Sequence, residues 1–179
     1  ENKYLKTLIE LQIFKENSEN ATIWTRKFDK YSHYLAVGMK NGSINIYETI
    51  NYIDTIYDKE DELKYFFLID EIPKKKLKVH TSDIIDLCWY NYNCDLLLSA
   101  SLDYRVILWD ISLEKSFLKE YKHSDMVTCV KFSPSDPTMF ATGCLDKYIR
   151  IYKIDLEYLN ISDLNESSRI KKKKKKKIF

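Results

Sequence analysis

Apolar and polar residues alternate along short segments of this chain, with the period of two that is typical of half-buried β-strands. In residues 85–89, Ile85, Leu87 and Trp89 alternate with Asp86 and Cys88. The run 96–98 is entirely leucine, which predicts a strand buried on both faces. Asn-Gly at 41–42 predicts a tight hairpin, because this pair accepts the positive φ angles that such a turn requires. The pattern therefore indicates an all-β chain of short antiparallel strands.

The strand pattern repeats. An offset of 43 positions relates His80 to His123, Trp89 to Phe132, Asp103 to Asp146 and Trp109 to Tyr152. A fainter copy lies upstream, where Phe28, Asn41 and Tyr47 take the places of Trp89, Asp103 and Trp109. A period of about 40–45 residues is typical of the four-stranded blades of a β-propeller.

A His near the start of each copy and Trp-Asp near its end resemble the WD40 repeat, and this resemblance covers Thr7 to Ile154. It implies a partial β-propeller of about three WD40 blades, each a four-stranded antiparallel sheet. Propellers have about 4–8 blades, so we expect the chain to be a fragment of a seven-bladed ring, or one piece completed by another. The expected parts are residues 1–20 (a closing or preceding-blade strand and loop), 21–79 (blade 1), 80–122 (blade 2), 123–168 (blade 3 and linker) and 169–179 (a disordered lysine tail).

Blade 1 carries a charged insertion at residues 49–79, because Tyr47 to His80 spans 33 positions whereas Trp109 to His123 spans 14. Within it, Tyr65–Ile69 is apolar and is expected to be the outer strand of the blade. The insertion fits either a solvated loop or a binding loop, since insertions in repeat proteins map to loops that often lie on a binding face. Lys6–Phe14 is expected to form a further strand before blade 1.

The family resemblance also implies a buried hydrogen-bond network in each blade. In the family pattern, Asp accepts from the His ring, His meets a Ser or Thr hydroxyl, and that hydroxyl meets the Trp indole N–H, because Trp has only a donor and Asp only acceptors. By resemblance, His80, Ser99, Asp103 and Trp109 form the complete set in blade 2. His123, Thr142, Asp146 and Tyr152 form a nearly complete set in blade 3. Blade 1 departs at all four places, with Glu19, Val37, Asn41 and Tyr47, so no network is expected there.

The same residues suggest a hydrolase triad, but the repeat explains them better. The trio recurs one period later, and no Gly-x-Ser-x-Gly segment is present. A nucleophile also needs a base, an orienting group and an oxyanion site. We therefore expect no enzyme activity.

Charge is unevenly distributed. The net charge is +2, and Arg169 with Lys171–Lys177 carries 8 positive charges, which leaves −6 for residues 1–168. An acidic body is a poor nucleic-acid surface. The basic tail suits RNA, an anionic membrane or a nuclear import receptor, although a translated A-rich tract or the end of a truncated gene model explains it better.

The four cysteines, at 88, 94, 129 and 144, include no Cys-x-x-Cys pair, so we expect free thiols in a reducing compartment, with no metal and no cofactor. No signal peptide and no run of about 18 apolar residues occurs. We expect a cytoplasmic protein.

Two segments narrow the resemblance. Residues 21–28 (ATIWTRKF) and 123–154 (HSDMVTCVKFSPSDPTMFATGCLDKYIRIYKI) are similar to the family of WD repeat-containing protein 44, which is Rab11-binding. This similarity implies a protein scaffold in vesicle trafficking, a Rab-type small GTPase as partner, and peripheral association with endosomal or vesicle membranes. In that family the GTPase-binding segment lies outside the propeller, so no such residues are transferred.

Partner contacts on a propeller are expected at its axial ends. On the end that carries the His loops and the Asp turns, the exposed candidates are Asp83, Leu102, Tyr104, Asp125, Met126, Leu145 and Lys147. The alternative function is a scaffold in RNA processing or ribosome biogenesis, with the lysine tail contacting RNA.

Overall fold

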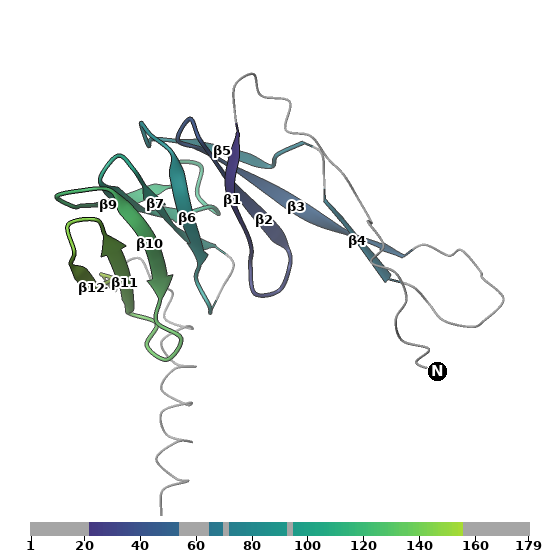
Figure 1. Cartoon of the computed structure of the whole chain (residues 1–179). Helices are drawn as coiled ribbons and strands as arrows, with labels where there is room; N and C mark the ends of the chain where they lie inside the picture. The colour runs from purple at the N-terminus through teal and green to yellow at the C-terminus, as the bar shows by residue number, and fades with distance from the viewer. Residues whose placement is uncertain (1–21, 54–64, 70–71, 93–94, 156–179) are drawn as a thin grey trace, which may run out of the picture.

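The computed structural model describes residues 22–53, 65–69, 72–92 and 95–155, and within these it contains strands and no helix. The strands form three antiparallel sheets that follow one another along the chain and fan side by side (Figure 1). The first strands of the three sheets lie next to one another, with β6 packed against both β1 and β10. This is the arrangement of consecutive propeller blades, and it confirms the predicted fold class.

Each sheet is called a blade here. Blade 1 consists of β1 (Ile23–Phe28), β2 (Tyr34–Met39), β3 (Ser43–Ile53) and β5 (Lys75–Lys78). Blade 2 consists of β6 (Ile84–Trp89), β7 (Leu96–Ser101), β8 (Arg105–Asp110) and β9 (Phe117–Lys122). Blade 3 contributes β10 (Val127–Phe132), β11 (Met139–Cys144) and β12 (Ile149–Lys153). One more strand, β4 (Tyr65–Ile69), pairs with the far half of β3.

The outer strand of blade 1 is a correction to the sequence analysis. Tyr65–Ile69 does not fill that place; it pairs with residues 49–53 of β3 as a two-stranded extension that points away from the blades (Figure 1). The outer strand is β5, which pairs with residues 43–46 of β3 and buries only Leu77. An edge strand needs few buried side chains, and lysines on it discourage pairing with other chains. The strand predicted at Lys6–Phe14 and the linker predicted after residue 155 lie outside the described residues.

The turn between the second and third strand of each blade is built in the same way. The side chains of Asn41, Asp103 and Asp146 each accept a hydrogen bond from the backbone N–H two residues later, at 2.9, 3.2 and 3.0 Å. The residue between is left-handed in every case, with φ of 80° at Gly42, 68° at Tyr104 and 70° at Lys147. Asx side chains that bond their own backbone favour this conformation.

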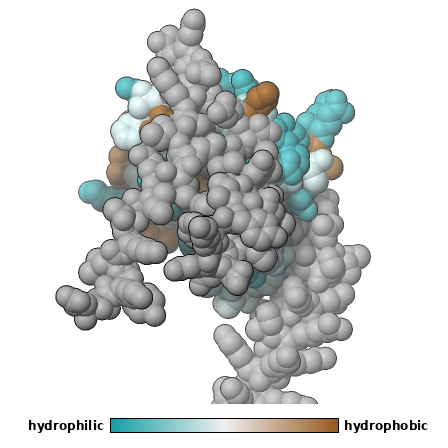
Figure 2. Space-filling model, turned by 90° about the vertical axis from the view of Figure 1, so that its right-hand side faces the viewer, coloured by the Kyte–Doolittle hydropathy of each residue, from teal (hydrophilic) through white to brown (hydrophobic). Residues whose placement is uncertain are grey.

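Two apolar layers hold the blades together. Between blades 1 and 2 the layer contains Ala36, Ile44, Ile46, Ile84, Leu97 and Ile107 among others, and between blades 2 and 3 it contains Leu98, Val106, Leu108, Val130, Phe132 and Phe140 among others. Both faces of blade 2 are therefore buried, as the leucine run predicts. In the side view of Figure 2, by contrast, small hydrophobic areas lie among larger hydrophilic ones on the coloured surface.

Candidate protein-interaction face

One end of the blades gathers the residues that the sequence singled out. We call it the turn face: the turns 40–42, 102–104 and 145–147, together with the loops 79–83 and 123–126 that precede β6 and β10. Backbone hydrogen bonds tie each loop to its turn, since the N–H of Leu102 donates to the Asp83 carbonyl (3.1 Å) and that of Leu145 to the Met126 carbonyl (3.0 Å). Neighbouring blades are joined as well, because the N–H of His123 donates to the Tyr104 carbonyl (2.8 Å). The turn face is one continuous surface.

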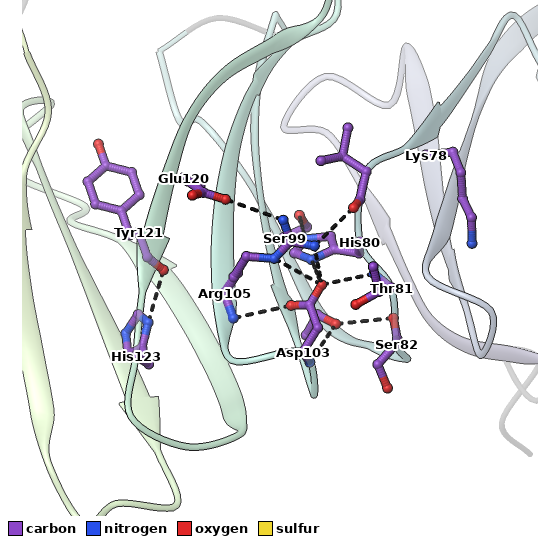
Figure 3. Close-up of polar contacts among 12 residues, drawn as sticks. Lys78, His80, Thr81, Ser82, Ser99, Asp103, Arg105, Glu120, Tyr121 and His123 are labelled. Carbon is purple, nitrogen blue, oxygen red and sulfur yellow. Dashed lines mark hydrogen bonds and ion pairs between the residues drawn. The ribbon is translucent and has the colours of Figure 1, made fainter.

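In blade 2 the structure brings the four predicted side chains together beneath the turn face. Figure 3 shows three of them, His80, Ser99 and Asp103. His80 Nδ1 lies 2.8 Å from Asp103 Oδ2, and His80 Nε2 lies 2.7 Å from Ser99 Oγ. The Trp109 indole N–H donates to the same Ser99 oxygen at 2.8 Å. His80, Ser99 and Trp109 are at most 2% exposed, so the chain of hydrogen bonds is shielded from water.

Asp103 is also held by groups that the sequence analysis did not single out. Arg105 Nη2 donates to Asp103 Oδ2 at 2.7 Å and to the Val79 carbonyl at 2.9 Å, while Arg105 Nη1 reaches Glu120 Oε2 at 3.3 Å. Burial opposes ionisation of Asp103, but the hydrogen bonds from His80 and Arg105 outweigh it and hold the pKa of this carboxyl well below its usual range. The turn is thus fixed to the loop before β6 by a charged, largely buried contact. An Arg two positions after the Asp, on the same strand face, is the signal that could have identified Arg105.

In blade 3 the network differs from the expectation, and Asp146 does not bond His123. His123 Nδ1 instead lies 3.1 Å from the Tyr121 carbonyl, while its Nε2 lies 2.9 Å from Thr142 Oγ1. Asp146 is occupied by Arg150, whose Nη2 is 2.5 Å away, and by the Ser124 hydroxyl. The pKa of Asp146 is lowered, chiefly by the bond from Arg150.

The Tyr152 hydroxyl also departs from the expectation, since it lies 3.5 Å from His123 Nε2 rather than on Thr142. A phenol carries its oxygen beyond the place where an indole carries its N–H, so Tyr does not reproduce the Trp contact. The blade 3 network is therefore shorter, and it is half buried.

Blade 1 has no such network among its described residues. Val37 and Tyr47 pack in an apolar cluster with Leu35, and Glu19 lies outside the described residues. Asn41 caps its own turn, as described above. Gly42 packs closely beneath the loop of blade 2, because an added Cβ would lie 2.6 Å from the His80 carbonyl oxygen.

All seven candidate partner residues lie on the turn face. Leu145 and Tyr104 are 54% and 43% exposed, and Lys147 is also exposed, while Asp83, Leu102, Asp125 and Met126 are half-buried. Asp83 already accepts a hydrogen bond at 2.8 Å from the indole of Trp24, which is 53% exposed. Sequence reasoning missed Trp24 and also Tyr148, which is 67% exposed and lies against the Arg150 guanidinium. An alternating pattern gives only a weak signal that an aromatic side chain is exposed, and the structure is needed to show it.

Metal-ligating residue types are scattered over the described residues. They contain no group of three or more His, Cys, Asp or Glu side chains placed to hold a metal ion. Cys88, Cys129 and Cys144 are free thiols, and burial raises the pKa of Cys88. These residues, whose regular elements are all strands, include no helix that could span a membrane.

A family model described as "WD domain, G-beta repeat" matches residues 71–110 and 115–153. The first match runs from β5 to the end of β8, and the second from just before β9 to the end of β12. Each repeat unit therefore joins the outer strand of one blade to the three inner strands of the next.

Curated relatives share these repeats over part of their length. WD repeat-containing protein 44 of Xenopus laevis is 41% identical over 85 residues, which are 47% of this chain and 9% of the relative. An uncharacterized WD repeat-containing protein of Schizosaccharomyces pombe is 31% identical over 152 residues, 79% of this chain and 24% of the relative. Protein HIR1 of Candida albicans is 30% identical over 138 residues, 75% of this chain and 14% of the relative. The chain thus spans a quarter or less of these relatives.

Solved structures show the same fold. A chain in the crystal structure of the mitotic checkpoint complex aligns with a TM-score of 0.59 at 19% identity, covering 77% of this chain and 36% of the other. The β-propeller domain of Cps50 (Swd1) from Myceliophthora thermophila aligns with a TM-score of 0.55 at 21% identity, covering 75% of this chain and 38% of the other. At these identities the likeness concerns the fold.

Proposed function

This chain carries WD40 repeats arranged as adjacent β-propeller blades, and on that premise we propose that it is a non-catalytic interaction scaffold whose partner protein binds the turn face. WD-repeat proteins act as protein-interaction scaffolds. One observation supports the turn face in particular: exposed apolar and charged side chains stand on turns that buried hydrogen bonds hold in place. A partner that binds a fixed surface loses less conformational entropy than one that must order it.

The chemistry of the face defines the partner. Tyr104 and Leu145 on the face offer apolar contact, as does Trp24 of β1, which bonds Asp83 of the face. Aromatic side chains on a rigid support are the usual anchors of protein interfaces. Asp83 and Asp125 add carboxylates beside them. A protein segment with apolar side chains and a basic group fits this combination.

The finer proposal is that the scaffold works in vesicle trafficking, in the cytoplasm or peripherally on endosomal membranes, with a small GTPase in the assembly. It is supported by the 41% identity with WD repeat-containing protein 44 across 85 residues. The GTPase is expected to join through segments other than the propeller, so the turn face is proposed for a further member of that assembly.

The test is affinity capture of the full chain and of two matched variants from cell lysate, in buffers with a GTP analogue or GDP. Leu145→Lys places a charge on the turn face. Leu113→Lys makes the same change at a similarly exposed leucine (47% against 54%) in the β8–β9 turn at the opposite end of the blades. We expect Leu145→Lys to lose the captured protein at least tenfold and Leu113→Lys to keep it.

Equal capture by both variants would contradict binding at the turn face. Vesicle proteins and a small GTPase, enriched with the GTP analogue, are expected in the captured set. RNA-processing factors that disappear with RNase, or on deletion of Lys171–Lys177, would instead support the alternative scaffold. Binding through the lysines should also weaken steeply with salt, because it rests on contacts with phosphates.

A further inference from the structure

A pocket of about 240 Å³ lies at the end of the blades opposite the turn face. β1 begins at the turn face, because the Thr22 carbonyl accepts the Lys40 N–H at 2.9 Å, and it ends at the pocket with Lys27 and Phe28. β6 lies between β1 and β10 (Figure 1), and the second halves of β6 and β10 complete the pocket. All three blades therefore contribute to its wall.

Hydrogen bonds between neighbouring blades fix the floor of the pocket. The Trp89 indole N–H donates to the Lys27 carbonyl at 2.8 Å, which ties β6 to β1. The Val130 N–H donates to Asp86 Oδ2 at 3.1 Å, which ties β10 to β6. The other oxygen of Asp86 accepts the Leu87 N–H at 2.9 Å, so the backbone occupies both oxygens of this carboxylate.

Three lysines, Lys27, Lys30 and Lys131, line this pocket, which we call the lysine pocket. All three side chains are exposed, and the Lys30 ammonium lies 5.2 Å from the centre of the Tyr31 ring. Within the part of the chain that the structure describes, none of the three forms an ion pair with a carboxylate. Asp86 is the one acidic residue among those that line the pocket, so the lining carries a net charge of +2.

Two of the lysines recur at one place in the repeat. Lys27, Cys88 and Lys131 each stand one residue before the aromatic residue that ends the first strand of its blade. Burial raises the pKa of the Cys88 thiol, whereas the charges of Lys131 and Lys27 lower it. The two ammonium groups thus lie close enough to one buried sulfur to act on it, from the strands on either side of β6.

We propose that the lysine pocket binds a phosphate monoester. Lysine ammonium groups bind phosphate as point charges, and a monoester carries a charge of about −1.5 to −2 at pH 7, which matches the lining. The volume lies just below the roughly 300–1,000 Å³ of small-molecule pockets, so a phosphorylated side chain or a small phosphorylated metabolite fits. Nucleic acid fits poorly, because residues 1–168 as a whole carry −6. The pocket and the turn face lie at opposite ends, so neither proposal depends on the other.

The test is a two-dimensional NMR titration of the full chain at low ionic strength, where charge interactions are least screened. The probes are capped phosphoserine, which represents a protein segment, and glycerol 3-phosphate, which represents a metabolite. Capped glutamate, with a single negative charge, is the control. We expect saturable shifts of the amides of Lys27, Cys88 and Lys131, with a phosphate probe bound at least tenfold more tightly than glutamate. The tighter phosphate probe identifies the source of the group.

Matched variants assign the binding to the pocket. Lys27→Gln with Lys131→Gln is expected to weaken phosphate binding at least tenfold without moving the thermal transition, because both side chains are exposed. Lys76→Gln with Lys115→Gln removes the same charge from exposed positions outside the lining, and it should change binding less than twofold. Leu145→Lys should also leave phosphate binding unchanged, so failure of the turn-face proposal and failure of this one are distinguishable.

Four outcomes would overturn the proposal. Shifts that grow linearly without saturation would show that the lysines are merely solvated. Shifts confined to Lys171–Lys177 would place the binding on the lysine tail. Equal weakening by the two double variants would show a general effect of charge, and glutamate bound as tightly as phosphate would show no preference for the doubly charged group.

Discussion

Replacing Ser99 by alanine tests whether the buried network of blade 2 holds the blade together. The Ser99 hydroxyl accepts the Trp109 indole N–H at 2.8 Å and lies 2.7 Å from His80 Nε2. His80 Nδ1 faces the Asp103 carboxylate, so the proton sits on Nδ1, and Nε2 accepts from the serine. Removal of one oxygen therefore leaves one donor and one acceptor without their partner.

The magnitude follows from burial. Ser99 is 0%, His80 1% and Trp109 2% exposed, so water cannot replace the hydroxyl without opening the blade. Each buried polar group left unsatisfied costs about 1–3 kcal/mol, which gives about 2–6 kcal/mol for Ser99→Ala. That is a large part of the stability of an ordinary domain, about 5–15 kcal/mol.

The matched control is Thr142→Val at the same position of blade 3. Thr142 bonds only the half-buried His123 there, at 2.9 Å, and the Tyr152 hydroxyl lies 3.5 Å from the same nitrogen. We expect a loss of about 1 kcal/mol, near the average for a hydrogen bond.

The assay is urea unfolding followed by tryptophan fluorescence, with free energies from linear extrapolation. If Ser99→Ala does not fold, the double variant with Trp109→Phe removes the orphaned indole donor and should regain part of the folded population. Losses for Ser99→Ala and Thr142→Val that agree within about 0.5 kcal/mol would refute the reasoning, because the two hydroxyls differ in the burial of their histidine partners and in the number of groups that they bond.

Three further outcomes are expected. The pKa of Asp103 is lower in the folded state than in the unfolded state. The carboxylate therefore contributes its full stabilisation above the unfolded pKa of about 3.9, and this stabilisation is lost as the pH falls from there toward the folded pKa. Unfolding free energies measured from pH 6 to 2 should fall more steeply for the wild type than for Asp103→Asn. Burial lowers the pKa of His123, so the unfolded chain takes up the proton of this histidine at a higher pH than the folded chain. The free energy of unfolding should therefore decline as the pH falls below about 6.5. His123→Asn should reduce this decline in urea titrations at pH 7.5 and 5.5. Position 42 has a φ of 80°, and the Cβ of Gly42→Ala would lie 2.6 Å from the His80 carbonyl oxygen. Calorimetry is expected to show that this variant loses more than about 2 kcal/mol of unfolding free energy, whereas Lys40→Ala, at an exposed position, loses none.

The fold was predictable because the repeat constrains it several times over. Asn41, Asp103 and Asp146 stand at corresponding places in three copies, and each closes the same kind of turn. A single Asp would have been an ordinary turn residue. Recurrence at a fixed offset, with apolar strands between, leaves few architectures other than stacked sheets.

The site was less predictable, because spacing shows which groups come close and not which bond forms. His123 and Asp146 lie near each other as the period requires, yet Arg150 and Ser124 occupy the carboxylate. In blade 2 the arginine is Arg105, two residues after Asp103, and it binds the carboxylate without displacing His80. A charged neighbour at a different position on the strand thus changes which partner the histidine finds.

The prediction of the outer strand of blade 1 was wrong for a different reason. Tyr65–Ile69 is the most apolar segment of the insertion, and apolar content favoured it over the lysine-rich Lys75–Lys78. An outer strand needs only one covered side chain, and Leu77, 4% exposed, supplies it. Apolar content therefore measures how deeply a strand is buried, and it misleads at the edge of a sheet.

Blade 2 is the part of the molecule on which the other two depend. Both of its faces are covered, and among the described residues it alone carries the complete network, so opening it exposes two apolar layers and breaks the buried hydrogen bonds together. Blade 3 has the shorter network and a single apolar layer, so separating it from blade 2 exposes that layer only.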